Sequence, residues 1–248
     1  MGDESAHSIY FLYLIAMIEV GFFAYLVYRI KKIITVYKSE RDNYYFKEDS
    51  LYAAVGNVIG TNMIIRLIFS ETSVFFYAFL GWKLKKSDTS KGTLFTYHKT
   101  IQYGILFWVI FVITIITAPV LHFLLIQWHV SVAWVVTGLT IYSLIWFCGD
   151  YNIIKHKPIV LLENKLLIRI GIRWKADIAL PNIQNVESIV SEEEEKAYTN
   201  LTLLVHEKNI FITLHEPVRI EGMFGIMKTT SKIALYVDEP YGFIEKIS

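Results

Sequence analysis

The sequence predicts an α+β protein in which transmembrane helices are followed by a small antiparallel β barrel or sandwich with a short C-terminal helix. Two observations carry this prediction. Residues 1–156 contain long apolar runs, whereas residues 157–248 alternate between apolar and polar positions, which is the pattern of half-buried strands. The composition agrees, because 54% of the residues are hydrophobic and only 19% are charged, which is more apolar than an ordinary soluble domain.

The overall composition excludes several classes of function. The chain carries 24 Lys and Arg against 23 Asp and Glu, so it lacks the basic excess of a nucleic-acid-coating protein. Its one cysteine, Cys148, rules out a disulfide scaffold and every CxxC metal or redox motif. We therefore expect no nucleic-acid partner. We also expect no metal site and no cofactor, because no HExxH, Walker A or GxGxxG motif occurs.

Three stretches reach the length of about 20 apolar residues that a membrane-spanning helix needs. They are residues 8–28, 101–126 and 130–149. The acidic start MGDESAH is unlike a cleaved signal peptide, so the first stretch is interpreted as a retained anchor. Lys and Arg follow the first stretch, precede the second and follow the third, and the other ends of the stretches have none. These three ends lie on the cytoplasmic side if the N-terminus is outside and the C-terminus is cytoplasmic, which agrees with the excess of basic residues at cytoplasmic flanks. The sequence thus predicts a multi-pass protein of the cell membrane.

Residues 51–82 are apolar but interrupted, and the sequence leaves two interpretations open. The first is a pair of amphipathic helices that lie on the inner leaflet or pack under the spans. The second is a re-entrant hairpin with residues 70–73 at its tip, which would require a protein-lined cavity.

Strand patterns begin beyond Pro158. Residues 166–178 alternate over a length greater than most strands, so Gly171 is expected to mark a turn or bend between two of them. A short helix over residues 239–247 is expected to end the chain, with Asp238 as its cap. Further predicted strands cover residues 159–162, 183–190, 201–206, 210–214, 218–222 and 233–237.

The stretches KPIVLLENKLLIRIGIRWKADIALPNIQNVESI (157–189) and KIALYVDEPYGFIEKI (232–247) resemble the bacterial pleckstrin-homology-like (PH-like) domain of membrane-anchored proteins. The whole chain is similar in layout to multi-span membrane proteins of Gram-positive bacteria. The resemblance implies a PH-like fold for residues 157–248, and it implies that basic residues on the opening strands bind acidic headgroups. Its motifs are structural, so they bear on the fold more than on the function.

The candidate binding residues lie on the predicted opening strands, and they share one strand face if Gly171 does not reverse the alternation. They are Lys165, Arg169, Arg173 and Lys175. Near an anionic leaflet each could contribute about 1 kcal/mol to binding. The alternative is a solvated face whose partners are Glu163 or Asp177.

Two acidic residues lie in or next to the predicted spans. Glu19 is a functional candidate because a carboxylate in lipid is costly, although a protonated Glu19 hydrogen-bonded between helices would have no role beyond assembly. Asp150, at the inner end of the third span, is interpreted as an ordinary interfacial residue.

These observations favour a non-enzymatic membrane protein whose cytoplasmic PH-like domain binds a protein or lipid. The expected partners are membrane lipid, another membrane protein or a second copy of the chain. An alternative is a transport or resistance component that uses Glu19 and residues 51–82, and a lipid enzyme is a third. We predict no catalytic residue, because Glu19 is the one clear ionisable residue inside the predicted spans.

Overall fold

The computed structural model describes residues 3–84, 91–99, 103–203 and 208–247, with side chains from residue 15 onward except that of Phe224. The chain divides into two compact units, Met1–Ile65 and Arg66–Ser248. Each unit is described by itself.

The first unit consists of two α-helices. Helix α1 (Asp3–Glu40) is followed by a 3-10 turn (Arg41–Asn43) and by α2 (Lys47–Ile59). Near its C-terminal end α1 is held to α2 by a hydrogen bond that the Arg29 guanidinium donates to the carbonyl of Val58. The predicted span 8–28 lies inside α1, but the side chains of residues 3–14 are outside the described part, so this span stays a prediction.

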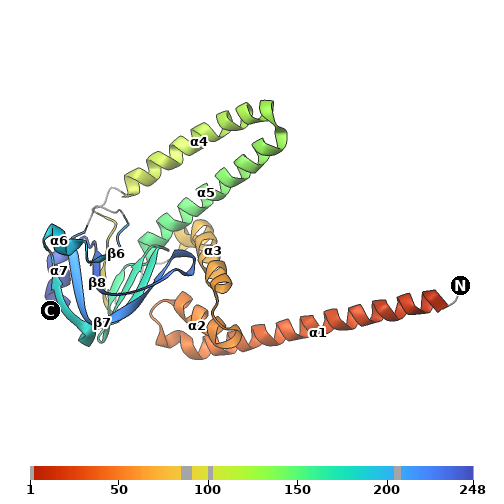
Figure 1. The fold of residues 1–248 in the computed structure, drawn as a ribbon, viewed down its shortest axis with the longest axis horizontal. Helices are drawn as coiled ribbons and strands as arrows, with labels where there is room; N and C mark the ends of the chain where they lie inside the picture. The colour runs from red at the N-terminus through yellow and green to blue at the C-terminus, as the bar shows by residue number, and fades with distance from the viewer. Residues whose placement is uncertain (1–2, 85–90, 100–102, 204–207, 248) are drawn as a thin grey trace. The chain divides into compact units, whose positions relative to one another are not determined.

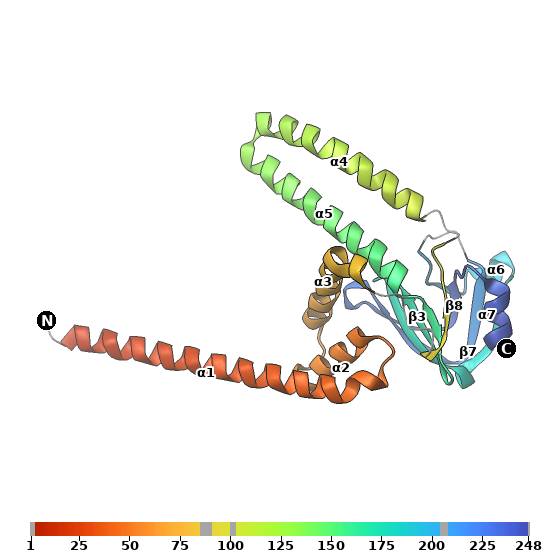
Figure 2. The same ribbon diagram turned by 180° about the vertical axis from the view of Figure 1, so that it is seen from behind.

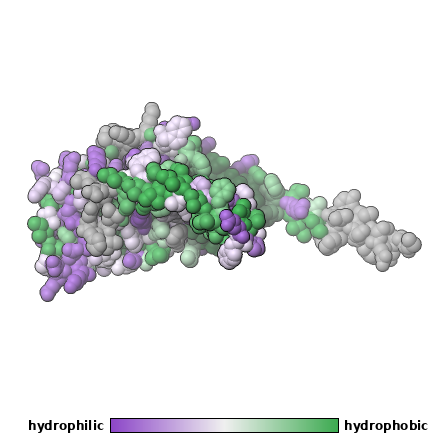
Figure 3. Space-filling model, turned by 90° about the horizontal axis from the view of Figure 1, so that it is seen from above, coloured by the Kyte–Doolittle hydropathy of each residue, from purple (hydrophilic) through white to green (hydrophobic). Residues whose placement is uncertain are grey.

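The second unit contains three helices that are long and apolar enough to cross a membrane: α3 (Met63–Leu80), α4 (Tyr103–Trp128) and α5 (Val130–His156). Helices α4 and α5 match the predicted stretches 101–126 and 130–149. They form an antiparallel hairpin that turns at His129 (Figure 1). Hydrophobic residues gather over this hairpin, whereas hydrophilic ones gather over the sheet (Figure 3).

Helix α3 corrects one expectation for residues 51–82. The break in this region falls at residues 60–62, where Gly60 has a φ of 96°, and residues 70–73 lie inside α3. The re-entrant hairpin with its tip at residues 70–73 is therefore wrong. The polar residues 70–73 do not end the helix, and the Glu71 carboxylate accepts a hydrogen bond from the Tyr142 hydroxyl at 2.7 Å.

The β part of the second unit is an open, mostly antiparallel sheet. Among the described residues its strands follow the order β1-β2-β3-β4-β7-β8-β6, and β5 pairs with β7. The strands are β1 (Thr93–Phe95), β2 (Ile159–Leu161), β3 (Lys165–Ile170), β4 (Trp174–Ala179), β5 (Ile183–Glu187), β6 (Thr199–Asn200), β7 (Ile210–Gly222) and β8 (Met227–Leu235).

Several strand predictions are confirmed and others change. The predicted strands 210–214 and 218–222 are one strand, β7, with a register shift between Thr213 and Val218. Strand β1 precedes the apolar hairpin in the chain, so the sheet is not confined to residues 157–248. Of the predicted strand 201–206, residues 201–203 are not in a strand, since β6 ends at Asn200, and residues 204–206 lie outside the described residues.

The predicted turn at Gly171 is confirmed. It joins β3 to β4, and the register pairs Lys165 with Ala179 and Arg169 with Lys175. The alternating side chains of these strands form the core, in which Leu166, Ile168 and Ile178 are fully buried.

The C-terminal helix is also confirmed. Helix α7 (Pro240–Ile247) packs Phe243 edge-on against Phe95, with ring centroids 4.9 Å apart. It lies at the side of the sheet away from α5 (Figures 1 and 2). A four-residue helix, α6 (Glu192–Glu195), follows β5 and is capped by Ser191.

Candidate functional site: a buried junction between the apolar hairpin and the sheet

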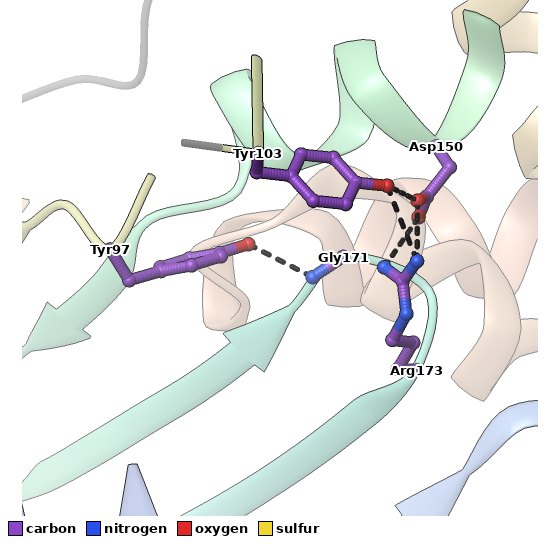
Figure 4. Close-up of polar contacts among 5 residues, drawn as sticks. All are labelled: Tyr97, Tyr103, Asp150, Gly171 and Arg173. Atoms are coloured by element: carbon purple, nitrogen blue, oxygen red, sulfur yellow. Dashed lines mark hydrogen bonds and ion pairs between the residues drawn. The ribbon is translucent and has the colours of Figure 1, made fainter. Parts of the chain in front are cut away.

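A buried polar cluster joins both sheet-side ends of the α4–α5 hairpin to the β3–β4 turn (Figure 4). Asp150, near the end of α5, has no exposed surface. Its carboxylate accepts a hydrogen bond from the Tyr103 hydroxyl, at the start of α4, at 2.5 Å. The Arg173 guanidinium approaches both carboxylate oxygens, at 2.9 and 3.1 Å. This two-point contact is the strongest geometry for an arginine–carboxylate pair.

The turn that carries Arg173 is fixed by Gly171. This residue has a φ of 56°, in the left-handed region that favours glycine. A Cβ here would lie 3.0 Å from Asp150 Oδ1, so a side chain would also push the carboxylate away. On the other side, the Gly171 N–H donates a hydrogen bond of 2.9 Å to the Tyr97 hydroxyl. The turn is thus held by Asp150 and by Tyr97.

The charges in this junction compensate one another. Burial alone would lower the pKa of Arg173, but the negative charge of Asp150 and contacts with Tyr103 outweigh it, so the pKa is raised and the guanidinium stays charged. Burial raises the pKa of Tyr97, which therefore stays a neutral hydroxyl. A buried carboxylate is tolerated only when it is paired and hydrogen-bonded in this way. The arrangement anchors two parts of the chain to each other.

The four predicted cations do not share one face of the sheet in the structure. Lys165, Arg169 and Lys175 share the face of β3 and β4 away from the core, as the alternation predicts. Arg173 leaves this face, because the Gly171 turn directs it to Asp150. Arg169 is only 4% exposed, and its guanidinium contacts the Asp177 carboxylate at 2.7 Å. Arg169 and Arg173 are therefore engaged in ion pairs within the protein.

Asp150 differs from its sequence interpretation, whereas the role considered for Glu19 stays a prediction. Glu19 is exposed on α1, in the first compact unit. Asp150, interpreted as an ordinary interfacial residue, is instead the centre of the junction. No local signal in the sequence could have identified it, because Tyr103 and Arg173 lie 47 and 23 residues away.

Several polar side chains of the apolar helices are hydrogen-bonded within the second unit, and the His122 ring lies 2.7 Å from the Thr137 hydroxyl across the α4–α5 hairpin. Glu71 is hydrogen-bonded to Tyr142, and the hydroxyls of Thr114, Thr117 and Thr140 donate to carbonyls of their own helices. Within the described residues, no three His, Cys, Asp or Glu side chains come together as a metal site would require.

His98, between β1 and α4, gives the second unit a pH-dependent element. Its burial lowers its pKa from 6.5, Lys155 and Lys99 lower it further, and only Asp238 opposes the change. The unfolded chain then takes up a proton more readily than the folded one. This part of the stability is therefore present above pH 6.5 and is lost as the pH falls from there through the lower pKa of the folded state.

We therefore expect the thermal midpoint of the purified chain in detergent to fall between about pH 7.5 and about pH 5.5. The fall should be smaller for His98→Gln, whose side chain does not titrate in this range. An equal fall in the two proteins would show that His98 does not contribute to it.

The comparisons of this chain with protein-family models, with curated proteins and with solved structures found no match.

Proposed function

We propose that this protein is a non-enzymatic, multi-pass protein of the cell membrane that holds a PH-like β module at the cytoplasmic face as a docking site for a partner protein. The α4–α5 hairpin supplies the membrane anchor. The sheet and its closing helix α7 supply the module. The N-terminus lies outside and the C-terminus inside.

The distribution of charge supports this orientation. Lys155 and Lys157 lie at the sheet end of α5, whereas the α4–α5 turn contains no Lys or Arg in residues 127–129. Cytoplasmic flanks collect basic residues, so the sheet end is assigned to the cytoplasm. The Lys155 ammonium lies 4.1 Å from the centre of the Tyr151 ring, an arrangement suited to the membrane interface.

The strand pairing supports a PH-like interpretation. The long strand β7 pairs with β4 near one end and with β5 near the other, so it links two parts of the sheet. A short C-terminal helix then covers the core through Phe243, which is fully buried. Both features agree with the resemblance of residues 157–189 and 232–247.

The observation that carries the proposal is the Asp150–Arg173 junction. A module that hung from the membrane on a flexible linker would need no buried ion pair between α5 and the β3–β4 turn. The pair fixes the module to the membrane helices and so holds its surface in a constant orientation. A constant orientation lowers the entropic cost of binding another membrane-bound protein.

We assign the docking surface to the outer edge of β5. Among the described residues this strand pairs with β7 alone. Gln184, Asn185 and Glu187 are exposed along it, and Ile189, just beyond its end, is 85% exposed. An extended segment of a partner can add to such an edge as a further strand. The lipid alternative is weaker, because Arg169 and Arg173 are engaged within the protein.

Site-specific photo-crosslinking in native membranes tests this function. A photoreactive residue at Gln184 is expected to give one discrete protein adduct. The same residue at the exposed Glu163, in the β2–β3 turn, is the matched control and should give none. No adduct at Gln184, or the same adduct at both positions, would contradict the docking edge.

A further inference from the structure

Helix α3 has two distinct faces in the second unit. One face contacts protein and carries Arg66, Ser70, Val74, Tyr77 and, just beyond the helix, Gly81. The other face exposes large apolar side chains at helical spacing, which are Leu67, Ile68, Phe75, Phe79 and Leu80, with Trp82 just beyond the end of the helix. An outward apolar face of this extent is not expected in contact with water.

Three contacts fix α3 at its start, middle and end. In its first turn, the Arg66 guanidinium reaches the carbonyl of Gly225 at 3.4 Å, at the tip of the β7–β8 hairpin. In the middle, the Val74 carbonyl packs against Gly149 so closely that a Cβ there would lie 2.3 Å from its oxygen. At the end, the Asn152 side-chain amide donates to the carbonyl of Tyr77 at 3.1 Å.

These three contacts lie on the sheet side of the α4–α5 hairpin, and the hydrogen bond between Glu71 and Tyr142 lies about two turns further along α5. Gly149 precedes Asp150, the residue at which α5 meets the sheet, and Gly225 belongs to the sheet itself. Both views show α3 beside the sheet end of α5 (Figures 1 and 2). A helix of 18 residues is about 27 Å long, so if α3 crossed the membrane, one of its ends would be far from that side.

We infer that α3 does not span the bilayer but lies in the membrane plane at the cytoplasmic leaflet, with its outward apolar face against the lipid chains. In this position α3 would hold the β module against the cytoplasmic leaflet along the whole length of the helix. This inference rests on the membrane location proposed above. We assign lipid to this face because it adjoins the exposed surface of α5, where the rings of Phe75 and Tyr142 lie 6.2 Å apart and both are partly exposed.

Two further features fit a helix at the interface. Trp82 is 70% exposed, and the Lys83 ammonium lies 4.7 Å from the centre of its ring. Tryptophan and lysine together are typical of the headgroup level. At the other end of α3, the tip of the β7–β8 hairpin exposes Ile226 and Met227, which are 54% and 38% exposed. Both residues follow Gly225, whose carbonyl is contacted by Arg66 of α3.

Spin-label depth measurements on the full chain in liposomes test the inference. Single cysteines at Ile68 and Phe79, in a Cys148→Ser background, would carry the label, and accessibility to oxygen and to a water-soluble nickel chelate gives the depth. If α3 spanned, these positions would differ in depth by about 16 Å. Ile116, in the middle of α4 and 64% exposed, is the deep-lipid control, and Ile189 is the water-exposed control.

We expect Ile68 and Phe79 to have the same shallow depth, between those of the two controls. A large difference in depth between them would overturn the inference and show that α3 spans. Free access of the nickel chelate to both would also overturn it. A label at Ile116 that is not in lipid would instead refute the membrane location of the hairpin, so the two failures are distinguishable.

Discussion

Replacing Asp150 by asparagine is expected to lower the stability of the chain by about 3 kcal/mol, because it leaves the Arg173 guanidinium at the junction without its counter-charge. The estimate takes the lower end of the range for buried pairs, since the Arg173 side chain keeps 25% of its surface exposed. In detergent, the thermal midpoint of the purified protein should fall by about 6–12 °C.

Two further variants make this prediction specific. Combining Asp150→Asn with Arg173→Met should cost less than the sum of the single changes, because no unpaired charge remains. The exposed pair Arg41–Asp42 is the control, and Asp42→Asn should leave the midpoint unchanged, since its side chain is 82% exposed. Strictly additive losses at Asp150 and Arg173 would show that the two residues do not act as a pair.

The second large effect is expected at the crossing of α3 and α5. Gly149→Ala would place a Cβ 2.3 Å from the Val74 carbonyl oxygen and 2.7 Å from its Cγ1, so the two helices must separate. Overpacking of this kind costs about 1–3 kcal/mol. We expect a lower thermal midpoint in detergent.

Gly138→Ala is the matched control in the same helix. A Cβ at Gly138 meets nothing within 4 Å, so alanine should leave the midpoint unchanged or raise it through its better helix propensity. If Gly149→Ala were as stable as Gly138→Ala, the close contact between α3 and α5 would not contribute to the fold.

The elements that the sequence predicts well are those with a local signal. The apolar runs identify α4 and α5 to within a few residues at most ends, because a helix in lipid needs a continuous apolar segment. The period of two around Gly171 identifies the β3–β4 hairpin, because alternate side chains must face the core.

The elements that the sequence misses depend on distant partners. Strand β1 has three residues, and it exists because it pairs with β2, beyond the whole α4–α5 hairpin. Helix α3 continues through residues 70–73, where Glu71 accepts a hydrogen bond from Tyr142, a residue 71 positions away. The junction needs Tyr103, Asp150 and Arg173 at once, and no periodicity in the chain reports that they meet.

The central claim is that the α4–α5 hairpin crosses the membrane and holds the β module in the cytoplasm. Cysteine labelling in intact cells tests it most directly, with single cysteines at His129 and Ile189 in a Cys148→Ser background. A membrane-impermeant maleimide should label position 129, in the α4–α5 turn, in intact cells and position 189 only after permeabilisation. Labelling of position 189 in intact cells, or of position 129 only after permeabilisation, would contradict the claim.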